Sequence, residues 1–218
     1  MDFFSFIKTR RSIRSFQEKE VNKETIKKII EMATYAPSAC NIQGWRFIVV
    51  DDQRKKQQIV DMGGSINIKK APLGILVLYD NRTKNAEYAD YIQSAAAAIQ
   101  NLLLSAHYLG LGACWICQLP PKKQLRKIFK IPKVLSPIAY IIIGHKRKES
   151  IAMPRKHNLD EIIDFNTFSS QAPLERINPF KLFVLKILIK VYSLVPGFIK
   201  SKWLNQYLDK KFVKKFHN

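Results

Sequence analysis

The sequence predicts a mixed α/β layered fold, in which helices alternate with apolar strands around one core. The chain has 218 residues, of which 47% are hydrophobic, and this suffices for a domain with a sizeable core. Segments with helical periodicity alternate with short apolar runs rich in β-branched residues. No internal repeat indicates a solenoid or a propeller.

The first half of the chain is expected to contain, in order, a helix at 3–9, a helix at 22–35, a strand at 45–50, a helix at 53–62 and a strand at 73–79. Asn22 can cap the second helix, and Pro37-Ser38 ends it. Its apolar residues recur at helical spacing, at Ile26, Ile29, Ile30 and Ala33.

The second half is expected to contain a long helix within 86–109, a strand edge or loop at 113–117, a helix at 122–129, a strand at 138–144 and a short helix at 159–163. The long helix carries four consecutive alanines, Ala95 to Ala98, which allow another helix to approach closely. We therefore expect it at the centre of the fold or at a subunit contact. Gly110 and Gly112 end it.

The chain is expected to divide into a domain at 1–165 and a basic amphipathic extension at 166–218. From Pro179 onward there are nine lysines and one acidic residue, Asp209, among many apolar side chains. The net charge of +20 favours anionic partners, namely a phosphorylated cofactor, an acidic membrane surface or nucleic acid.

The N-terminus places its apolar patch before Arg10-Arg11, the reverse of a signal peptide, and no ordinary transmembrane helix is expected. Three cysteines form no even disulfide framework and suit a reducing compartment. A cytoplasmic location is expected. Cys114-x-x-Cys117 has no nearby histidine or second cysteine pair to complete a metal site, so two structural thiols are the favoured interpretation.

Two segments carry candidate chemistry. Arg10-Arg11-Ser12-Ile13-Arg14 places three arginines within five residues of a chain that otherwise favours lysine. Guanidinium groups bind phosphate oxygens bidentately, so this segment is either an anion site or an ordinary basic turn. The second segment, residues 36–47, carries Ser38, Asn41 and Gln43 just before a buried strand. Considered alone, it is best explained as a helix stop followed by a turn.

Together, the two segments resemble the nitroreductase family of flavoproteins, which pairs Arg-Arg-Ser-x-Arg with Pro-Ser-x-x-Asn-x-Gln-Pro-Trp-x-Phe. Further similarities are Gly110-Leu111-Gly112-Ala113-Cys114-Trp115-Ile116, and Ile141-Ile142-Ile143-Gly144 followed by Pro154-Arg155-Lys156. The resemblance covers residues 3 to about 163. It implies an α+β fold with a mostly antiparallel central sheet flanked by helices, and a domain-swapped type of homodimer that binds FMN where the subunits meet.

The resemblance also implies roles for individual residues. Arg10 and Arg155, with Lys156, would hold the FMN phosphate, and Arg11 and Ser12 would contact the phosphate or ribityl region. Arg14 would lie near the pyrimidine edge of the flavin, where negative charge collects on reduction. The remaining implied contacts are Asn67 at that edge, Trp115 and Ile116 along the ring, and Pro37, Ser38, Ala39 and Asn41 from the partner subunit.

The sequence departs from the family pattern at three places. Gly44 stands where the family usually has proline, which loosens the loop without removing a contact. Ala113 and Cys114 make the flavin-side turn more apolar and add a thiol, and Cys117 completes the Cys-x-x-Cys spacing.

The activity that the resemblance implies is a ping-pong transfer of hydride from NADH or NADPH, through FMN, to a small electrophilic acceptor such as a nitroaromatic or a quinone. No side chain is assigned as a catalytic acid or base, because the cofactor carries the chemistry. The alternative is an accessory protein of the same fold that holds flavin or associates with a membrane without turnover.

The C-terminal extension has two interpretations. It either wraps the partner subunit, as such arms commonly do in this family, or binds an anionic membrane surface with its lysines at the headgroups. The second alternative would place the protein peripherally at the inner face of the membrane. Nucleic acid is not expected as a partner, because no recognition motif is present.

Overall fold

The computed structural model describes residues 2–82, 85, 87–149, 151–168, 178–180, 183, 184 and 187. The chain divides into two units, one containing residues 1–150 and the other comprising residues 151–195. In the second unit, the helix expected at 159–163 is the short 3-10 helix η2 (Leu159–Glu161). The predicted C-terminal extension, 166–218, lies almost entirely outside the described residues.

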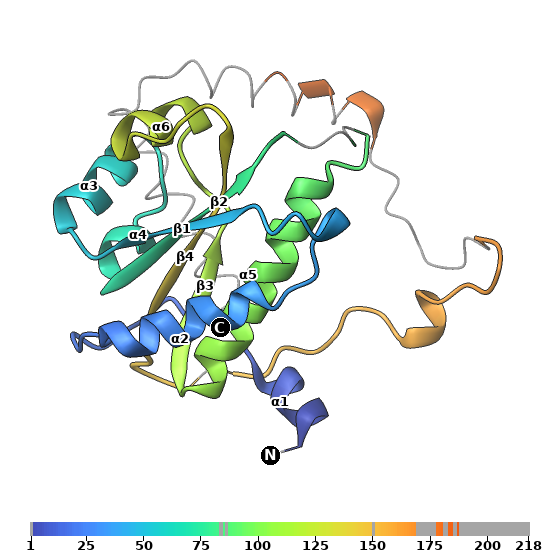
Figure 1. Ribbon diagram of the computed structural model, residues 1–218. Coiled ribbons are helices and arrows are strands. Elements are labelled where there is room, and N and C mark those ends of the chain that lie inside the picture. Colours follow the sequence, from blue (N-terminus) through green and yellow to red (C-terminus); the bar gives the residue numbers. More distant parts are fainter. Residues whose placement is uncertain are drawn as a thin grey trace. The chain divides into compact units, whose positions relative to one another are not determined.

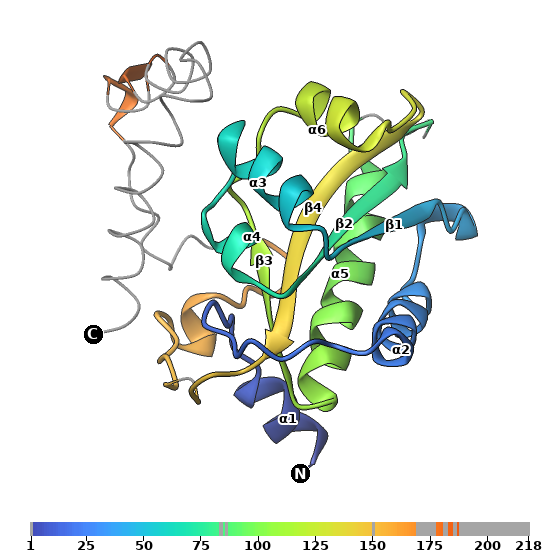
Figure 2. The same cartoon turned by 90° about the vertical axis from the view of Figure 1, so that its left-hand side faces the viewer.

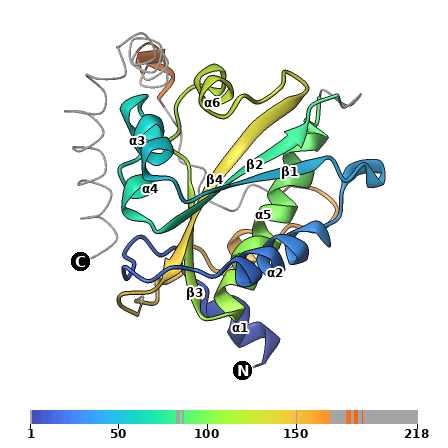
Figure 3. The same ribbon diagram turned by 60° about the vertical axis from the view of Figure 1, so that its left-hand side comes forward.

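A four-stranded antiparallel sheet forms the centre of the first unit (Figure 1). Its strands are β1 (Trp45–Val50), β2 (Leu73–Asp80), β3 (Leu111–Ile116) and β4 (Leu135–His145). They lie in the order β1-β2-β4-β3, so β3 is an edge strand, as Figure 3 also shows. The expectation of an antiparallel sheet flanked by helices is confirmed.

The two faces of the sheet contribute to two separate cores. Side chains alternate along a strand, so on β2 Ile75 and Val77 belong to one core, whereas Leu76 and Leu78 belong to the other. Every residue from Leu73 to Tyr79 is buried, as expected for a central strand covered on both faces. The predicted layered fold is therefore present.

Helices cover both faces of this sheet (Figure 2). On one face lie α2 (Lys23–Thr34) and α5 (Asp90–Tyr108), which pack against each other. On the other lie α3 (Gln53–Asp61), α4 (Asn67–Lys70) and α6 (Lys122–Phe129). Ala95 and Ala98 of α5 are fully buried in the first core, in agreement with a central position for this helix.

Capping residues and glycines in the sequence predicted the start of α2 and the end of α5 correctly. The Asn22 side chain accepts a 2.7 Å hydrogen bond from the Thr25 N–H at the start of α2. Gly110, with φ of 75°, follows the end of α5 in the left-handed conformation that favours glycine. The four-residue helix α4 was not predicted, because it is too short to show a period and has no side-chain cap.

The N-terminal helix α1 (Phe3–Thr9) packs against the end of α5 and thereby positions the arginine segment. The Phe6 ring stacks on His107 with a centroid separation of 5.0 Å. His107 Nε2 also lies 3.1 Å from Thr9 Oγ1. Among the described residues, none of the helices combines the length and hydrophobicity that crossing a membrane requires.

Candidate functional site

The arginine segment lies in extended conformation along the edge of the sheet. The Ile13 N–H donates to the Ala113 carbonyl at 3.0 Å, and Ser12 forms a parallel bridge with the same residue of β3. Further on, the Gln17 N–H donates to the His145 carbonyl at 2.9 Å. Ile13 and Phe16 are buried, so the segment is fixed by apolar contacts as well as by backbone hydrogen bonds.

Arg11 makes a contact that the motif did not predict. Its Nη1 donates to the Lys8 and Arg10 carbonyls at 2.6 and 2.8 Å, so the guanidinium bonds two carbonyls at the end of α1. Its Nε is buried without a partner. An interaction of Arg11 with FMN would therefore use the backbone or require its side chain to turn. Arg10, the residue that follows α1, is half-buried.

A cavity of about 970 Å³ brings Arg14 and Asn67 together from distant parts of the sequence. Asn67 is 8% exposed, and its Nδ2 donates to Ser65 Oγ at 3.2 Å. Five basic side chains and three acidic ones line the cavity, which favours an anionic ligand. Its charged lining residues are Arg14, Lys19, Lys23, Lys70, Arg147, Glu18, Glu20 and Asp51.

Lys70 is a candidate that the sequence analysis missed. It lines the same cavity as Arg14 and Asn67. The signal that could have found it is the Asn67-x-x-Lys70 spacing, because residues three apart share one face of a helix. It was overlooked because α4 itself was not predicted.

The loop at Pro37–Asn41 is held in an uncommon backbone conformation. Cys40, Asn41 and Gln43 have positive φ angles of 49°, 52° and 50°. Hydrogen bonds hold this shape: Ala39 N–H donates to Ser94 Oγ at 3.0 Å, and Gln43 N–H to Ser38 Oγ at 3.1 Å. Non-glycine residues with such angles cluster where a loop performs a function. Pro37 and Asn41 are exposed, whereas Ser38 and Ala39 are half-buried.

In the chain, the arginine segment lies between α1 and α2, whereas this loop follows α2 (Figure 1). The helix between them has twelve residues and is about 18 Å long, and Arg14 and Ala39 line two different cavities. The structure therefore brings Arg14 and Asn67 to one place and holds the Pro37–Asn41 loop at another.

Trp115 and Ile116 are neighbours on the edge strand β3 and lie on opposite faces of the sheet. Trp115 packs against the core under α2 and α5, whereas Ile116 is buried in the core under α3, α4 and α6. They therefore cannot line the same ring face with both side chains. One of them would contact a flavin through its backbone.

Cys114 is buried on the face of β3 that the arginine segment covers. Burial raises the pKa of its thiol, and the nearby Arg14 and Ser12 offset this in part. Cys117 is exposed, and both cysteines are free. Among the described residues, no three histidine, cysteine or acidic side chains are grouped so as to hold a metal ion. Arg155 and Lys156 are exposed residues of the second unit.

Comparison with known proteins agrees with the fold and the order of the motifs. The model of the nitroreductase family matches residues 7–66 and 61–145. The chain belongs to the nitroreductase family. It is thus related to oxidoreductases, and the resemblance noted in the sequence is confirmed.

Individual relatives agree with this assignment. The chain is 37% identical over 150 residues to a protein of Methanothermobacter thermautotrophicus named NADH dehydrogenase/NAD(P)H nitroreductase, covering 66% of this chain and 78% of the other. A Clostridium difficile FMN-dependent nitroreductase structure is 34% identical, with a TM-score of 0.67, and covers 76% of this chain and 100% of its own. A structure of a Desulfovibrio desulfuricans nitroreductase in complex with FMN is 30% identical, with a TM-score of 0.64. The match covers 76% of this chain and 96% of the other.

Gly112 allows the arginine segment to lie against β3. Replacing Gly112 by a larger residue should therefore displace this segment. A Cβ at this position would lie 2.7 Å from Ile13 Cγ2. We expect Gly112→Ala to lower the free energy of unfolding by about 1 to 3 kcal/mol and to weaken FMN binding, because Ile13 must move. Urea unfolding and titration of the apoprotein with FMN would measure the two effects.

The matched control is Gly110→Ala. This change meets no neighbouring atom but strains a residue with φ of 75°. It should therefore cost about 1 kcal/mol of stability without changing the affinity for FMN. Equal FMN affinity in wild type and Gly112→Ala would show that the position of the segment does not matter for the flavin.

Proposed function

We propose that this nitroreductase-family chain is an FMN-dependent oxidoreductase that transfers electrons from NADH or NADPH to a small electrophilic acceptor. It works as a homodimer with the flavin between the subunits. One subunit contributes the arginine segment, Asn67 and β3, and the partner contributes the loop at Pro37–Asn41. The observation that carries this proposal is the basic cavity shared by Arg14 and Asn67.

The donor set of this cavity fits the pyrimidine edge of a flavin. When bound, FMN supplies the hydride transfer, and its reduced form carries negative charge beside that edge. Arg14 and Lys70 place two cations in the same cavity, and Asn67 adds an amide that can donate and accept. Fixed cations there stabilise the reduced state electrostatically. No side chain of the site needs to act as an acid or base.

The phosphate end of the cofactor is assigned to arginine side chains. Arg10 at the end of α1 and Arg155 of the second unit, with Lys156, would bind the phosphoryl oxygens. Ser12 lies between Arg10 and Arg14 in the sequence, is an exposed residue and is held by its backbone bridge to Ala113, which suits a contact with the same end of the cofactor. Guanidinium groups form two parallel hydrogen bonds with such oxygens.

The homodimer is supported by the separation of the two motifs. In one chain, Arg14 and Ala39 line two different cavities, and α2 lies between the two motifs in the sequence, which supports a role of the loop in the flavin site of another subunit. Its hydrogen-bonded conformation leaves the Asn41 side chain exposed for that contact.

The proposal is tested by purifying the protein, releasing its cofactor by heating and following flavin absorbance anaerobically after NADH or NADPH is added. We expect FMN in the heated supernatant and bleaching of the bound flavin. Full flavin occupancy without bleaching would instead favour a flavin-holding accessory protein. A colourless protein that cannot be loaded with FMN would refute both.

A further inference from the structure

The helices on the two faces of the sheet differ in charge. On one face, α3, α4 and α6 carry nine basic residues and one acid, Asp61. On the other face, α2 and α5 carry three lysines and three acids. No acidic residue occurs between Asp90 and Glu149 in the sequence, a stretch that includes all of α6. One side of the sheet is therefore strongly basic, whereas the other is balanced.

Helix α6 presents lysines to solvent. Its Leu125 is 1% exposed and belongs to the core under this helix. Lys123 and Lys127 stand two residues before and after Leu125, so at about 100° per residue they lie on the opposite side of the helix. Lys130 directly follows the last helical residue, and all three lysines are exposed. These three residues form the lysine row of α6.

Neighbouring basic groups extend the lysine row. Helix α3 packs against α6 (Figure 2), and Lys55 Nζ donates to the Ile128 carbonyl at 2.9 Å. Arg54 of α3 and Lys133 of the loop after α6 are exposed. Within the part of the chain that the structure describes, no acid forms an ion pair with a basic residue of α3, α4 or α6. The positive charge of this side is therefore not neutralised by the described residues.

The charges of α6 oppose the stability of the helix itself. Lys122 and Lys123 occupy its first turn, where the positive end of the helix dipole favours acids. Lys123 and Lys127 are like charges four residues apart, and such pairs destabilise a helix. Lys122 and Arg126 have the same spacing, and burial together with the charge of Arg126 lowers the pKa of Lys122. Because the lysine row does not stabilise the helix that carries it, an anionic partner outside the protein is the better explanation.

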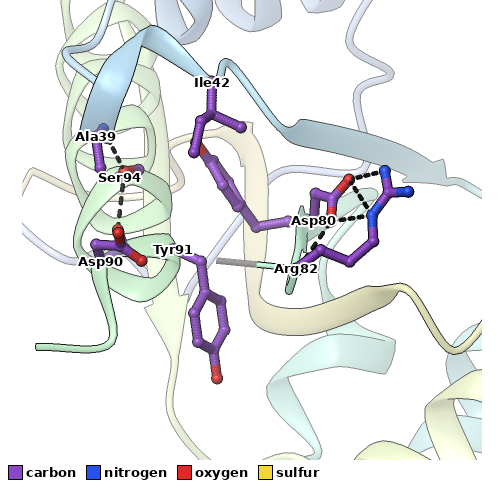
Figure 4. A pocket seen from close by; sticks show the side chains of 8 residues that line it. Ala39, Ile42, Asp80, Arg82, Asp90, Tyr91 and Ser94 are labelled. Carbon is purple, nitrogen blue, oxygen red and sulfur yellow. Dashed lines mark hydrogen bonds and ion pairs between the residues drawn. The ribbon is translucent and has the colours of Figure 1, made fainter. Parts of the chain in front are cut away.

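The lysine row lies on the other face of the sheet from the loop that is proposed to meet the partner subunit. That loop packs on α5, where the Ala39 N–H donates to Ser94 Oγ at 3.0 Å (Figure 4). No residue of α6 lines the basic cavity or the cavity beside this loop. The proposed flavin site therefore does not use the lysine row, which is left for a different partner.

We propose that the lysine row, with Arg54 and Lys133, docks the protein on a membrane surface that contains anionic lipids. Lipid headgroups offer negative charge without a fixed geometry, which suits the point charge of lysine, whereas the planar fork of arginine suits the defined phosphates of nucleic acids. Val134, directly after Lys133, is 42% exposed, and an apolar side chain beside lysines can enter the headgroup layer. This surface is separate in sequence from the C-terminal extension.

Co-sedimentation of the full-length, FMN-loaded protein with vesicles tests the proposal. Vesicles of phosphatidylglycerol and phosphatidylcholine in equal amounts are compared with vesicles of phosphatidylcholine alone, at low ionic strength. We expect wild type to bind the mixed vesicles and not the neutral ones. The double variant Lys123→Gln and Lys127→Gln should bind the mixed vesicles about 10- to 30-fold less tightly. Its midpoint of thermal unfolding should not fall, because both residues are exposed and glutamine is a good helix former.

The matched control is the double variant Lys27→Gln and Lys28→Gln. It removes the same charge from two exposed lysines of α2, on the other face of the sheet. This variant should bind the mixed vesicles like wild type. Both double variants should keep a flavin that NADH or NADPH reduces, because none of the four lysines lines the basic cavity.

Three results would overturn the inference. The first is a wild type that does not bind the mixed vesicles, even if Lys123 and Lys127 prove to bind a nucleic acid or an acidic protein. The second is an unchanged vesicle affinity of the α6 variant, which would assign the binding to other residues, such as those of the C-terminal extension. The third is an equal loss in both double variants, which would show an effect of net charge alone. All three leave the proposed function unaffected, since vesicle binding is measured without an electron donor.

Discussion

Replacing Arg14 by alanine should weaken FMN binding about 10- to 100-fold, the expected cost of one charge-assisted hydrogen bond. Arg14 lines the basic cavity with Asn67 and follows a segment anchored on β3, so its position is fixed before the ligand arrives. Removing this cation should also make the flavin harder to reduce. Fluorescence titration of the apoprotein with FMN measures the affinity.

Two further variants define the contribution of Arg14. Arg14→Lys keeps the charge but loses the planar fork, so its FMN affinity should lie between wild type and Arg14→Ala. Arg54→Ala removes an exposed arginine of α3 that does not line the cavity, and should bind FMN like wild type. If Arg14→Ala bound FMN with the same dissociation constant as wild type, the flavin would not bind in this cavity.

Lys56→Met should lower the free energy of unfolding by about 2 to 5 kcal/mol. Lys56 is fully buried, and its Nζ donates to the Ala71 and Pro72 carbonyls at 2.9 and 3.0 Å. Methionine has a similar volume but leaves both carbonyls without this donor. Because Ala71 and Pro72 also line the basic cavity, FMN affinity should fall as well. Urea unfolding with and without FMN measures both effects.

Lys69→Met is the control for this change, since Lys69 is exposed on the neighbouring α4, and it should leave stability within about 0.5 kcal/mol of wild type. Burial lowers the pKa of Lys56 from 10.5, against the opposing effect of Asp51 and Asp52. Just below pH 10.5, Lys56 therefore binds more protons in the unfolded chain than in the folded protein. The contribution of Lys56 to the free energy of unfolding thus rises with pH in this range. This pH dependence should be absent in Lys56→Met. If Lys56→Met were as stable as wild type, the buried hydrogen bonds of Lys56 would not stabilise the fold.

The sequence predicted the elements whose signals are local. Asn22 marks the start of α2 and Gly110 follows the end of α5, because caps and left-handed glycines act within a few residues. A family motif also pointed to Arg14, and the wider resemblance to Asn67, and the fold brings both to one cavity. Strand alternation would have shown that Trp115 and Ile116 lie on opposite faces, although the motif alone groups them.

Other features depend on contacts that cannot be derived from local patterns. The Arg11 guanidinium donates hydrogen bonds to carbonyls at the end of α1, because the geometry of the helix terminus places these carbonyls within its reach. Gly44 meets Tyr79 because β1 pairs with β2 in the register Trp45 to Tyr79, and that register follows from packing of the whole sheet. Lysine usually lies on the surface, so nothing in the local sequence indicates that Lys56 is buried. Its burial results from the tertiary fold.

The proposed flavin site is shared between two subunits, so inactive variants should complement each other. Arg14→Ala removes a cation from one half of the site, and Asn41→Gly removes the partner's side chain while keeping a backbone whose φ of 52° suits glycine. A heterodimer of the two variants would contain one site with both changes and one site with neither.

Co-expression of the two variants, followed by measurement of NAD(P)H-dependent quinone reduction, tests this arrangement most directly. Random pairing should give about a quarter of the wild-type activity per subunit, because half of the dimers carry one intact site. Each variant expressed alone should be far less active. Activity of the mixture no greater than the average of the two separate variants would contradict a site shared between subunits.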